Sequence, residues 1–573
     1  MTDEKAAKAP EGASAFDLVD VKAEAPSGPA VGAKLWAGLA APIAAAACSD
    51  GGGSPSPSQP TTPTPPAPAR VTSAQASRFL SQAAIGYSKA DLTALTNSTL
   101  DDWLTSQFSL TRPQKFWDYL VANGYSVIAN QNNQAGFDPM VWSQLMGSTD
   151  VLRQRVGLAL LNLWVVGIDG LTGSWRQFVM ADYLDRLWDN AFGNYRDIME
   201  AVSTSVGMAQ FLTFLNNAKA NPTTGSIPDE NYARELMQLF TIGLFTLNPD
   251  GTPSPSAANP TPTYTQADIA QHARVWTGYV YANTNNTTPD RIRLGLVVDP
   301  NRRETGASSF VGISVPAGVD GATARRIALD GLFNHPNTAP FVCKQLIQRL
   351  VTSNPSANYV ARVAAAFANN GSGVRGDMKA VIRAILTDSE ARDDAQISST
   401  TFGKLREPVV RLTQWARAFN VTSPTNAWPF GSTASSANRL AESPGRAPSV
   451  FNWFRPGYTV PGGAIAAAGL VAPEFQIANE PSVIAYVNYM QTVIASGVGE
   501  ARPDYSTLTP IAGDSQALLD ELNLVLAANQ ISSATIGSMK AALDTIPTTT
   551  SPLNRIYAAI LLVMACPEYL VQR

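Results

Sequence analysis

Apolar residues recur every three or four positions along most of the chain from about residue 72, which is the spacing of one buried face of an α-helix. In the first such stretch, Ala76, Phe79 and Leu80 follow this spacing, and Ser73 stands where a helix N-cap is expected. The same pattern recurs at 150–166, 175–188, 194–206, 266–278, 322–333, 336–352, 357–368, 377–386, 404–419, 481–497, 514–527, 533–546 and 553–569. The sequence therefore predicts a mainly α-helical protein.

One region, 281–321, breaks the helical pattern. It is rich in Asn, Thr and Gly and contains two alternating runs, 291–298 and 310–315, that are typical of short strands. We therefore expect a large multi-helix domain in two helical halves, 71–280 and 322–573, with a small inserted loop or β-hairpin region between them.

The N-terminal part of the chain has a different composition. An apolar run at 35–47 is preceded by Lys34 and ends in four alanines before Cys48. This run is too short to span a bilayer but suits the core of a signal peptide. Residues 49–70 are rich in Pro, Ser and Thr, and we expect an extended tether there. We expect 1–48 to be a bacterial lipoprotein-type signal with Cys48 as the acylated residue; the alternative is a disordered tail with an alanine-rich helix.

The composition removes several classes of function. The net charge is −4, so no basic surplus points to nucleic acid as a partner. Only two histidines are present, His272 and His335, which rules out a three-histidine metal site. The cysteines form no CxxC pair, and we expect no bound metal or cofactor. Cys343 and Cys566 either pair in an oxidising compartment or remain two buried thiols.

The segment 229–244 carries the best candidate for a functional surface. At 100° per residue, its polar side chains fall within one arc of roughly 140° on a helix. They are Glu230, Asn231, Arg234, Glu235, Gln238 and Thr241. Two carboxylates, a guanidinium and two amides on one face are typical either of a ligand-binding surface or of a structural polar network. In the structural alternative, Glu230 and Arg234 form an ordinary i,i+4 ion pair.

Two further residues are binding candidates because of their place in the sequence. His335 precedes a proline at the start of a predicted helix, where backbone amides attract anions, and Asn337 lies beside it. The alternative for His335 is a neutral imidazole that caps the helix. Asp268 and His272 have the i,i+4 spacing of two metal ligands, but a third ligand, such as Glu235, would have to come from elsewhere.

Carboxylates in the C-terminal part are weak candidates for catalysis. Glu474 and Glu480 flank a short segment that also contains Asn479, and two carboxylates can act as acid and base in glycoside cleavage. The weak catalytic candidates are therefore Glu235, Glu480 and His335. Their separation in space is not given by the sequence.

Several stretches, in order along the chain, resemble one known family. They are Arg78-Phe79-Leu80 with Gly86 and Asp91, Asn190 to Asp197, Glu230 to Gly243, His335 to Phe341, Gln345 to Leu350, Arg406-Glu407-Pro408, Ala447 to Phe454, Pro473 to Gln476 and Pro567 to Leu570. From about residue 72 to the end, the chain resembles bacterial proteins with the domain of unknown function 1800. One branch of that family has a histidine-rich stretch where this chain reads Ala159 to Trp164, so the resemblance implies no histidine-based metal site here.

The resemblance implies export, a helical fold and a partner, but no catalytic residues. Members are often encoded beside a secreted protein of the domain of unknown function 1501 family. We therefore expect an extracytoplasmic protein, either a lipoprotein of the outer membrane or periplasm, attached to the membrane through its lipid only, or a secreted one. We interpret it as an accessory or binding protein that presents a polar groove to a secreted partner or polymer. The alternative is a hydrolase of an extracellular polymer that uses carboxylates.

Overall fold

The computed structural model describes residues 70–548 and 551–573 of the 573-residue chain. Residues 67–573 form one compact unit. Three predictions concern residues outside the described ones: the apolar run at 35–47, the acylated Cys48 and nearly all of the tether at 49–70.

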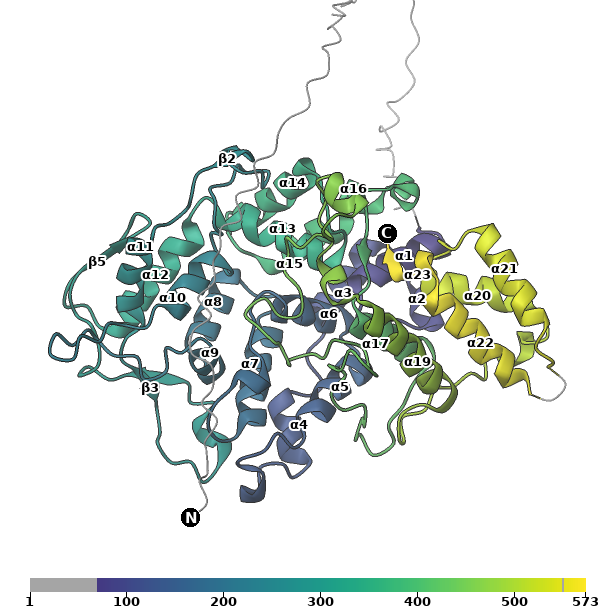
Figure 1. The fold of residues 1–573 in the computed structure, drawn as a ribbon, viewed down its shortest axis with the longest axis horizontal. Helices are drawn as coiled ribbons and strands as arrows, with labels where there is room; N and C mark the ends of the chain where they lie inside the picture. Colours follow the sequence, from purple (N-terminus) through teal and green to yellow (C-terminus); the bar gives the residue numbers. More distant parts are fainter. Residues whose placement is uncertain (1–69, 549–550) are drawn as a thin grey trace, which may run out of the picture. The chain divides into compact units, whose positions relative to one another are not determined.

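The fold is mainly α-helical, as predicted, and Figure 1 shows helices throughout this unit. Local caps explain many of the helix starts: the side chain of Thr72, for example, accepts a hydrogen bond from the backbone N–H of Gln75 at the start of the first helix. The helices before residue 280 are α1 Ser73–Ala83, α2 Lys89–Thr96, α3 Leu100–Ser109, α4 Phe116–Ala122, α5 Phe137–Gly147, α6 Val151–Leu161, α7 Arg176–Asp189, α8 Tyr195–Ser203, α9 Val206–Phe211, α10 Asn231–Gln238 and α11 Gln266–Ala273.

Helices also fill the chain from residue 321 to its end. They are α12 Gly321–Asn334, α13 Thr338–Leu350, α14 Ala357–Ala368, α15 Met378–Thr387, α16 Ser389–Arg392, α17 Pro408–Ala418, α18 Ala464–Ala467, α19 Glu480–Ser496, α20 Ser515–Ala527, α21 Ser533–Asp544, α22 Pro552–Ala565 and α23 Pro567–Leu570. Short 3-10 helices lie between the α-helices of both parts of the chain. They are η1 Ile128–Asn130, η2 Ile168–Gly170, η3 Arg274–Trp276, η4 Pro289–Arg291, η5 Asp394–Ser398, η6 Pro473–Ile477 and η7 Thr509–Ile511.

The inserted region contains short strands, but their pairing differs from the predicted single hairpin. β3 Tyr279–Tyr281 pairs antiparallel with β4 Leu296–Val298, whereas β5 Ser308–Phe310 and β6 Ile313–Val315 form a separate hairpin. The two alternating runs of the sequence therefore do not pair with each other: the first pairs with β3, and the second contains the turn of the β5–β6 hairpin. Another short pair, β1 Pro255–Ser256 with β2 Asn259–Pro260, lies before this region.

The start and the end of the described chain lie side by side. Helix α1 packs against α6, α15 and α20, and Figure 1 shows it beside α23 near the C-terminus. Strand β7 Lys404–Leu405 pairs with β8 Val571–Gln572 at the end of the chain. The two helical halves expected from the sequence are therefore in direct contact and share one core.

The two cysteines of this core do not form a disulfide. Cys343 and Cys566 are both buried free thiols. The thiol alternative is confirmed, and burial raises the pKa of the Cys566 thiol to about 11.

Candidate functional site

Helix α10 forms the centre of the predicted polar face, but it is shorter than predicted. It ends at Gln238, so Thr241 leaves the face and is buried. The hydroxyl of Thr241 donates a hydrogen bond of 2.6 Å to the carbonyl of Leu236. Gly243 has a φ of +71°, and a Cβ there would meet the ring of Phe341. The turn is therefore fixed by a side-chain bond and by a position that suits glycine.

Glu230, Arg234 and Gln266 connect α10 to the first turn of α11. The guanidinium of Arg234 lies 3.1 Å from the carboxylate of Glu230, which also accepts a 2.7 Å hydrogen bond from Gln266. The side chains of Arg234 and Glu230 are 34% and 21% exposed. This part of the face is half-buried, so it both holds two helices together and remains accessible.

Glu235 is the least satisfied member of the face. It is 7% exposed, and its Oε2 is buried without a hydrogen-bond partner among the described residues. Burial raises the pKa of Glu235 from an ordinary 4.5 to about 7, against the opposing effect of Arg234. The neighbouring Gln238 accepts a 2.8 Å hydrogen bond from Tyr264, so its own carbonyl oxygen is already occupied.

Helix α8 contacts α10, and the turn that follows it, through buried hydrogen bonds. The hydroxyls of Ser203 and Tyr232 lie 2.6 Å apart, and Tyr195 donates a 2.7 Å hydrogen bond to the carbonyl of Phe240. At the N-terminus of α10, the backbone N–H of Asn231 donates to a side-chain oxygen of Asp229. These contacts fix the helix on which Glu235 is presented.

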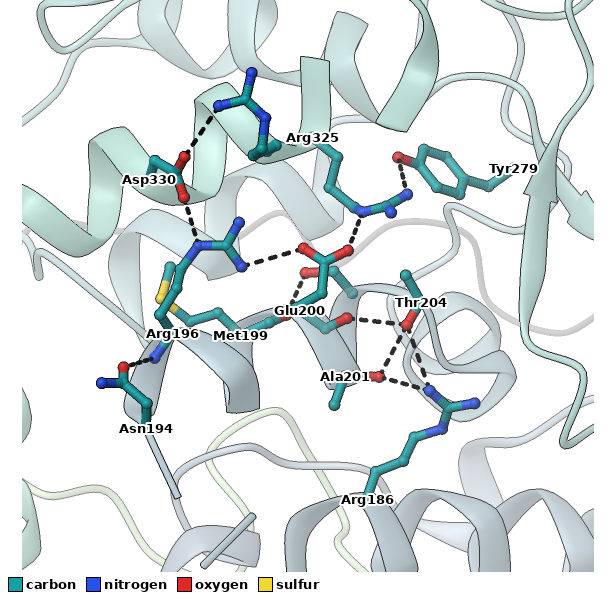
Figure 2. A network of polar contacts seen from close by, with 12 residues as sticks. Arg186, Asn194, Arg196, Met199, Glu200, Ala201, Thr204, Tyr279, Arg325 and Asp330 are labelled. Atoms are coloured by element: carbon teal, nitrogen blue, oxygen red, sulfur yellow. Dashed lines mark hydrogen bonds and ion pairs between the residues drawn. The ribbon is translucent and has the colours of Figure 1, made fainter. Parts of the chain in front are cut away.

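A chain of ion pairs joins α8 to α12 and makes this support rigid (Figure 2). Arg196 lies 2.8 Å from Asp330 and 3.1 Å from Glu200. Glu200 lies 2.7 Å from Arg325, which also donates to the hydroxyl of Tyr279. Each charge has an opposite partner, so this network is satisfied by the protein itself.

Asn337 has a structural position that differs from the predicted binding role. It is buried, and its amide nitrogen donates 2.8 Å hydrogen bonds to the carbonyls of both Ile242 and Phe245. Its oxygen accepts a 2.9 Å bond from the backbone N–H of Leu247. Both N–H groups of the side chain and one lone pair of its oxygen are thus occupied by the loop after α10, so no donor remains for a ligand.

His335 caps a helix terminus instead of opening a helix. It is the C-cap of α12, and α13 begins three residues later at Thr338. Its Nδ1 accepts a 3.1 Å hydrogen bond from the backbone N–H of Asn337. Desolvation lowers the pKa of His335. The geometry is that of the neutral imidazole cap, and the ring is half-buried.

His272 is a core residue in this structure. It is fully buried, its Nδ1 lies 3.0 Å from the carbonyl of Ala233, and its Nε2 accepts from the indole of Trp276 at 3.0 Å. Burial lowers the pKa of His272 to about 3. Asp268 accepts hydrogen bonds from the backbone N–H and the hydroxyl of Thr265, the N-cap of α11, and from the Val311 N–H. The described residues contain no group of three potential metal ligands.

The C-terminal carboxylates do not come together as an acid–base pair. Glu480 is exposed at the first residue of α19, and Asn479 serves as its helix cap. Glu474 is only 1% exposed and lies 3.0 Å from Lys404. Glu235 is on α10, which packs against α11, whereas α19 packs against α22. Figure 1 shows α10 and α19 in different parts of the molecule.

Sequence reasoning did not predict a large group of buried charges in the described part of the chain. We call it the buried ion cluster: Arg155, Arg349, Lys404, Arg406, Arg411, Glu407, Glu442 and Glu474. Lys404 lies 3.1 Å from Glu407, which also accepts a 2.9 Å hydrogen bond from Asn162. Arg155 lies 3.7 Å from the same carboxylate. Glu407 is therefore the hub of the cluster.

The two neighbouring carboxylates Glu407 and Glu442 titrate in opposite directions. Burial alone would raise the pKa of Glu407, but Lys404, Arg155 and the other cations hold it below its ordinary value. Burial and the charge of Glu407 raise the pKa of Glu442 to about 8. The available signal was the presence of Glu407 and Glu474 in the family-like stretches; Lys404 is three residues from Glu407, whereas Arg155 and Glu442 are distant in the sequence.

Comparison with known families agrees with these stretches. The family described as "Protein of unknown function (DUF1800)" matches residues 78–571, which is nearly the whole chain. The chain belongs to this family. No curated protein and no solved structure matches it.

For this DUF1800 protein, the match spans both the polar face on α10 and α11 that contains Glu235 and the buried ion cluster. Across the part of the chain that the structure describes, no helix has the length and apolar character needed to cross a membrane.

Proposed function

We propose that this DUF1800 protein is an exported, lipid-anchored binding protein whose contact surface is the α10–α11 face, defined by Glu230, Arg234, Glu235 and Gln266. The observation that supports this is Glu235, a buried carboxylate with an oxygen that no group of the described protein satisfies. Buried polar atoms are normally hydrogen-bonded, so such an atom beside a half-exposed surface suits a group supplied by a partner.

The charge of the face determines the chemistry of that partner group. Glu230 and Glu235 provide two carboxylates, and Arg234 alone opposes them on α10. Since Arg234 is already paired with Glu230 at 3.1 Å, Glu235 is the carboxylate left for an incoming cation. The proposed contact is a lysine or arginine of a secreted protein, and the candidate partner is a member of the domain of unknown function 1501 family.

A binding measurement with that secreted protein from the same genome tests the proposal. Glu235→Gln keeps the shape of the side chain but removes its charge, and we expect at least about tenfold weaker binding. Arg326→Ala is the control, because it also removes one side-chain charge, but from an i,i+4 ion pair with Asp330 on α12, outside the proposed face. No association at all, or equal loss in both variants, would overturn the proposal.

The alternative is a hydrolase in which Glu235 is the general acid. The observation that favours it is the pKa of Glu235, about 7, which suits proton transfer near neutral pH. No second carboxylate from the C-terminal set lies beside it, because Glu480 is exposed on another helix. Turnover of an extracellular polysaccharide that falls by orders of magnitude in Glu235→Gln would favour the hydrolase over the binding protein.

A further inference from the structure

A cavity of about 260 Å³ lies between α17, η6, α19 and the junction of α22 with α23. Its walls are mostly apolar and include Leu405, Leu440, Tyr486, Val487 and Leu570. Only two charged residues border it, Arg411 and Glu474. This volume is just below the range of about 300–1,000 Å³ that ligand pockets usually have, so the cavity suits a small molecule.

The two charged residues at the cavity are not equivalent. Glu474 has its charge opposed by Lys404 at 3.0 Å. Arg411 is 7% exposed, and no carboxylate forms an ion pair with it in the described part of the chain. Its Nε donates to the carbonyl of Arg406 at 2.8 Å, and its guanidinium lies over the ring of Tyr486, 4.6 Å from the centroid. Arg411 is thus held in place, and Glu442, the carboxylate whose charge acts on it, does so without a direct ion pair.

The charge balance of the buried ion cluster also favours a negatively charged group in the cavity. The cluster contains five cationic side chains and three carboxylates, all buried. Burying a charge is costly unless an opposite charge accompanies it. The surplus is positive, and Arg411 is the cation of the cluster that borders the cavity. An anion in the cavity would therefore balance charge that the protein leaves unbalanced.

We propose that this cavity binds a small molecule with an apolar body and one anionic group, a medium-chain carboxylate, whose oxygens pair with Arg411 while its chain contacts Leu440, Tyr486 and Val487. A guanidinium matches a carboxylate because two parallel N–H groups can donate to its two oxygens. This site is separate from the α10–α11 face, and the proposal holds whether or not that face binds a partner.

Calorimetric titration of the full chain with octanoate and with octan-1-ol tests the charge requirement. The two probes share the same apolar chain, so only the head group differs. We expect octanoate to bind and the alcohol to bind at least about tenfold more weakly, because the alcohol cannot neutralise Arg411. In Arg411→Gln this preference for the carboxylate should disappear.

A second variant keeps the test valid if Arg411→Gln does not fold. Ala478 lines the cavity, and Ala478→Phe fills it while leaving the buried ion cluster unchanged. We expect this variant to keep its thermal transition but to lose octanoate binding about tenfold or more. Ala357→Phe, on α14 and outside the cavity, is the control and should bind like the wild type. Equal affinity for octanoate and octanol, unchanged binding in Ala478→Phe, or no octanoate binding by the wild type would each overturn the proposal.

Discussion

Glu235 costs the folded protein stability whenever it is ionised. Its pKa is raised to about 7 in the folded state, from an ordinary 4.5, because burial penalises the charged form. The folded state therefore holds the proton more tightly than the unfolded state between these values. Stability is full below about pH 4.5 and falls as the pH rises toward 7, by about 3 kcal/mol at most.

Glu235→Gln should remove this pH dependence. We expect the variant to be about as stable as the wild type near pH 4.5 and more stable above pH 7, by up to about 3 kcal/mol. Urea unfolding at a series of pH values measures the difference between the two free energies of unfolding. A difference that stays constant across this range would show that the carboxylate is not buried as the structure places it.

Asn337 should behave as a structural residue. Asn337→Ala removes three hydrogen bonds to the loop at 242–247 and leaves buried backbone groups unpaired. We expect the free energy of unfolding to fall by about 3 kcal/mol, as measured by urea denaturation. Asn337→Asp retains the acceptor for Leu247 but turns a carboxylate oxygen toward the carbonyls of Ile242 and Phe245, so it should lose at least as much. An alanine variant with wild-type stability and weakened partner binding would instead support the original binding prediction.

Single residues of the buried ion cluster show where sequence reasoning stops. The helical periodicity places Arg155 and Glu407 in two predicted helices, 150–166 and 404–419, but it carries no information on their contact across the fold. In the structure Glu407 is the N-cap of α17. The residues that meet at Glu407 come from α6, from its C-cap Asn162 and from β7. Such contacts depend on how helices pack, so the spacing of residues along the chain cannot predict them.

At the scale of elements, the sequence predicted helix positions better than helix ends. The apolar side of α10 is buried as its periodicity requires, including Tyr232, Leu236 and Met237. The helix nevertheless stops at Gln238, since the Thr241 hydroxyl binds a backbone carbonyl and Gly243 adopts a positive φ. Side-chain-to-backbone bonds of this kind compete with the helix and are invisible to a periodicity argument.

Strand β8 ties the end of the chain to its middle. The amide of Gln572 donates to the carbonyl of Leu350 at 2.8 Å, and the carbonyl of Arg573 accepts a 3.2 Å bond from Arg78. Deletion of residues 571–573 should therefore lower the free energy of unfolding by about 2–4 kcal/mol.

Thermal denaturation checks this prediction at the C-terminus. Arg573→Ala is the control, because it keeps the backbone carbonyl and the β7–β8 pairing. We expect the control to melt close to the wild type and the deletion to melt clearly lower. Equal melting temperatures for the deletion and the wild type would mean that β8 contributes nothing to the fold.

At the scale of the whole molecule, the proposed attachment to the membrane depends on Cys48. If the proposed lipid anchor is correct, Cys48→Ser should abolish acylation and move the protein from the membrane fraction to the soluble fraction. Intact-mass analysis of the chain extracted from cells gives the answer. A wild-type chain that still begins at Met1 and carries no acyl group would exclude lipid anchoring.

The central claim is that Glu235, in its charged form, receives a cation from a secreted partner on the α10–α11 face. The most direct test is the affinity for the secreted protein of the domain of unknown function 1501 family, measured at pH 6 and pH 8. For a carboxylate with a pKa of about 7, the ionised fraction rises about tenfold across this interval. We predict an approximately tenfold gain in affinity for the wild type and none for Glu235→Gln; the same pH dependence in both proteins would contradict the account.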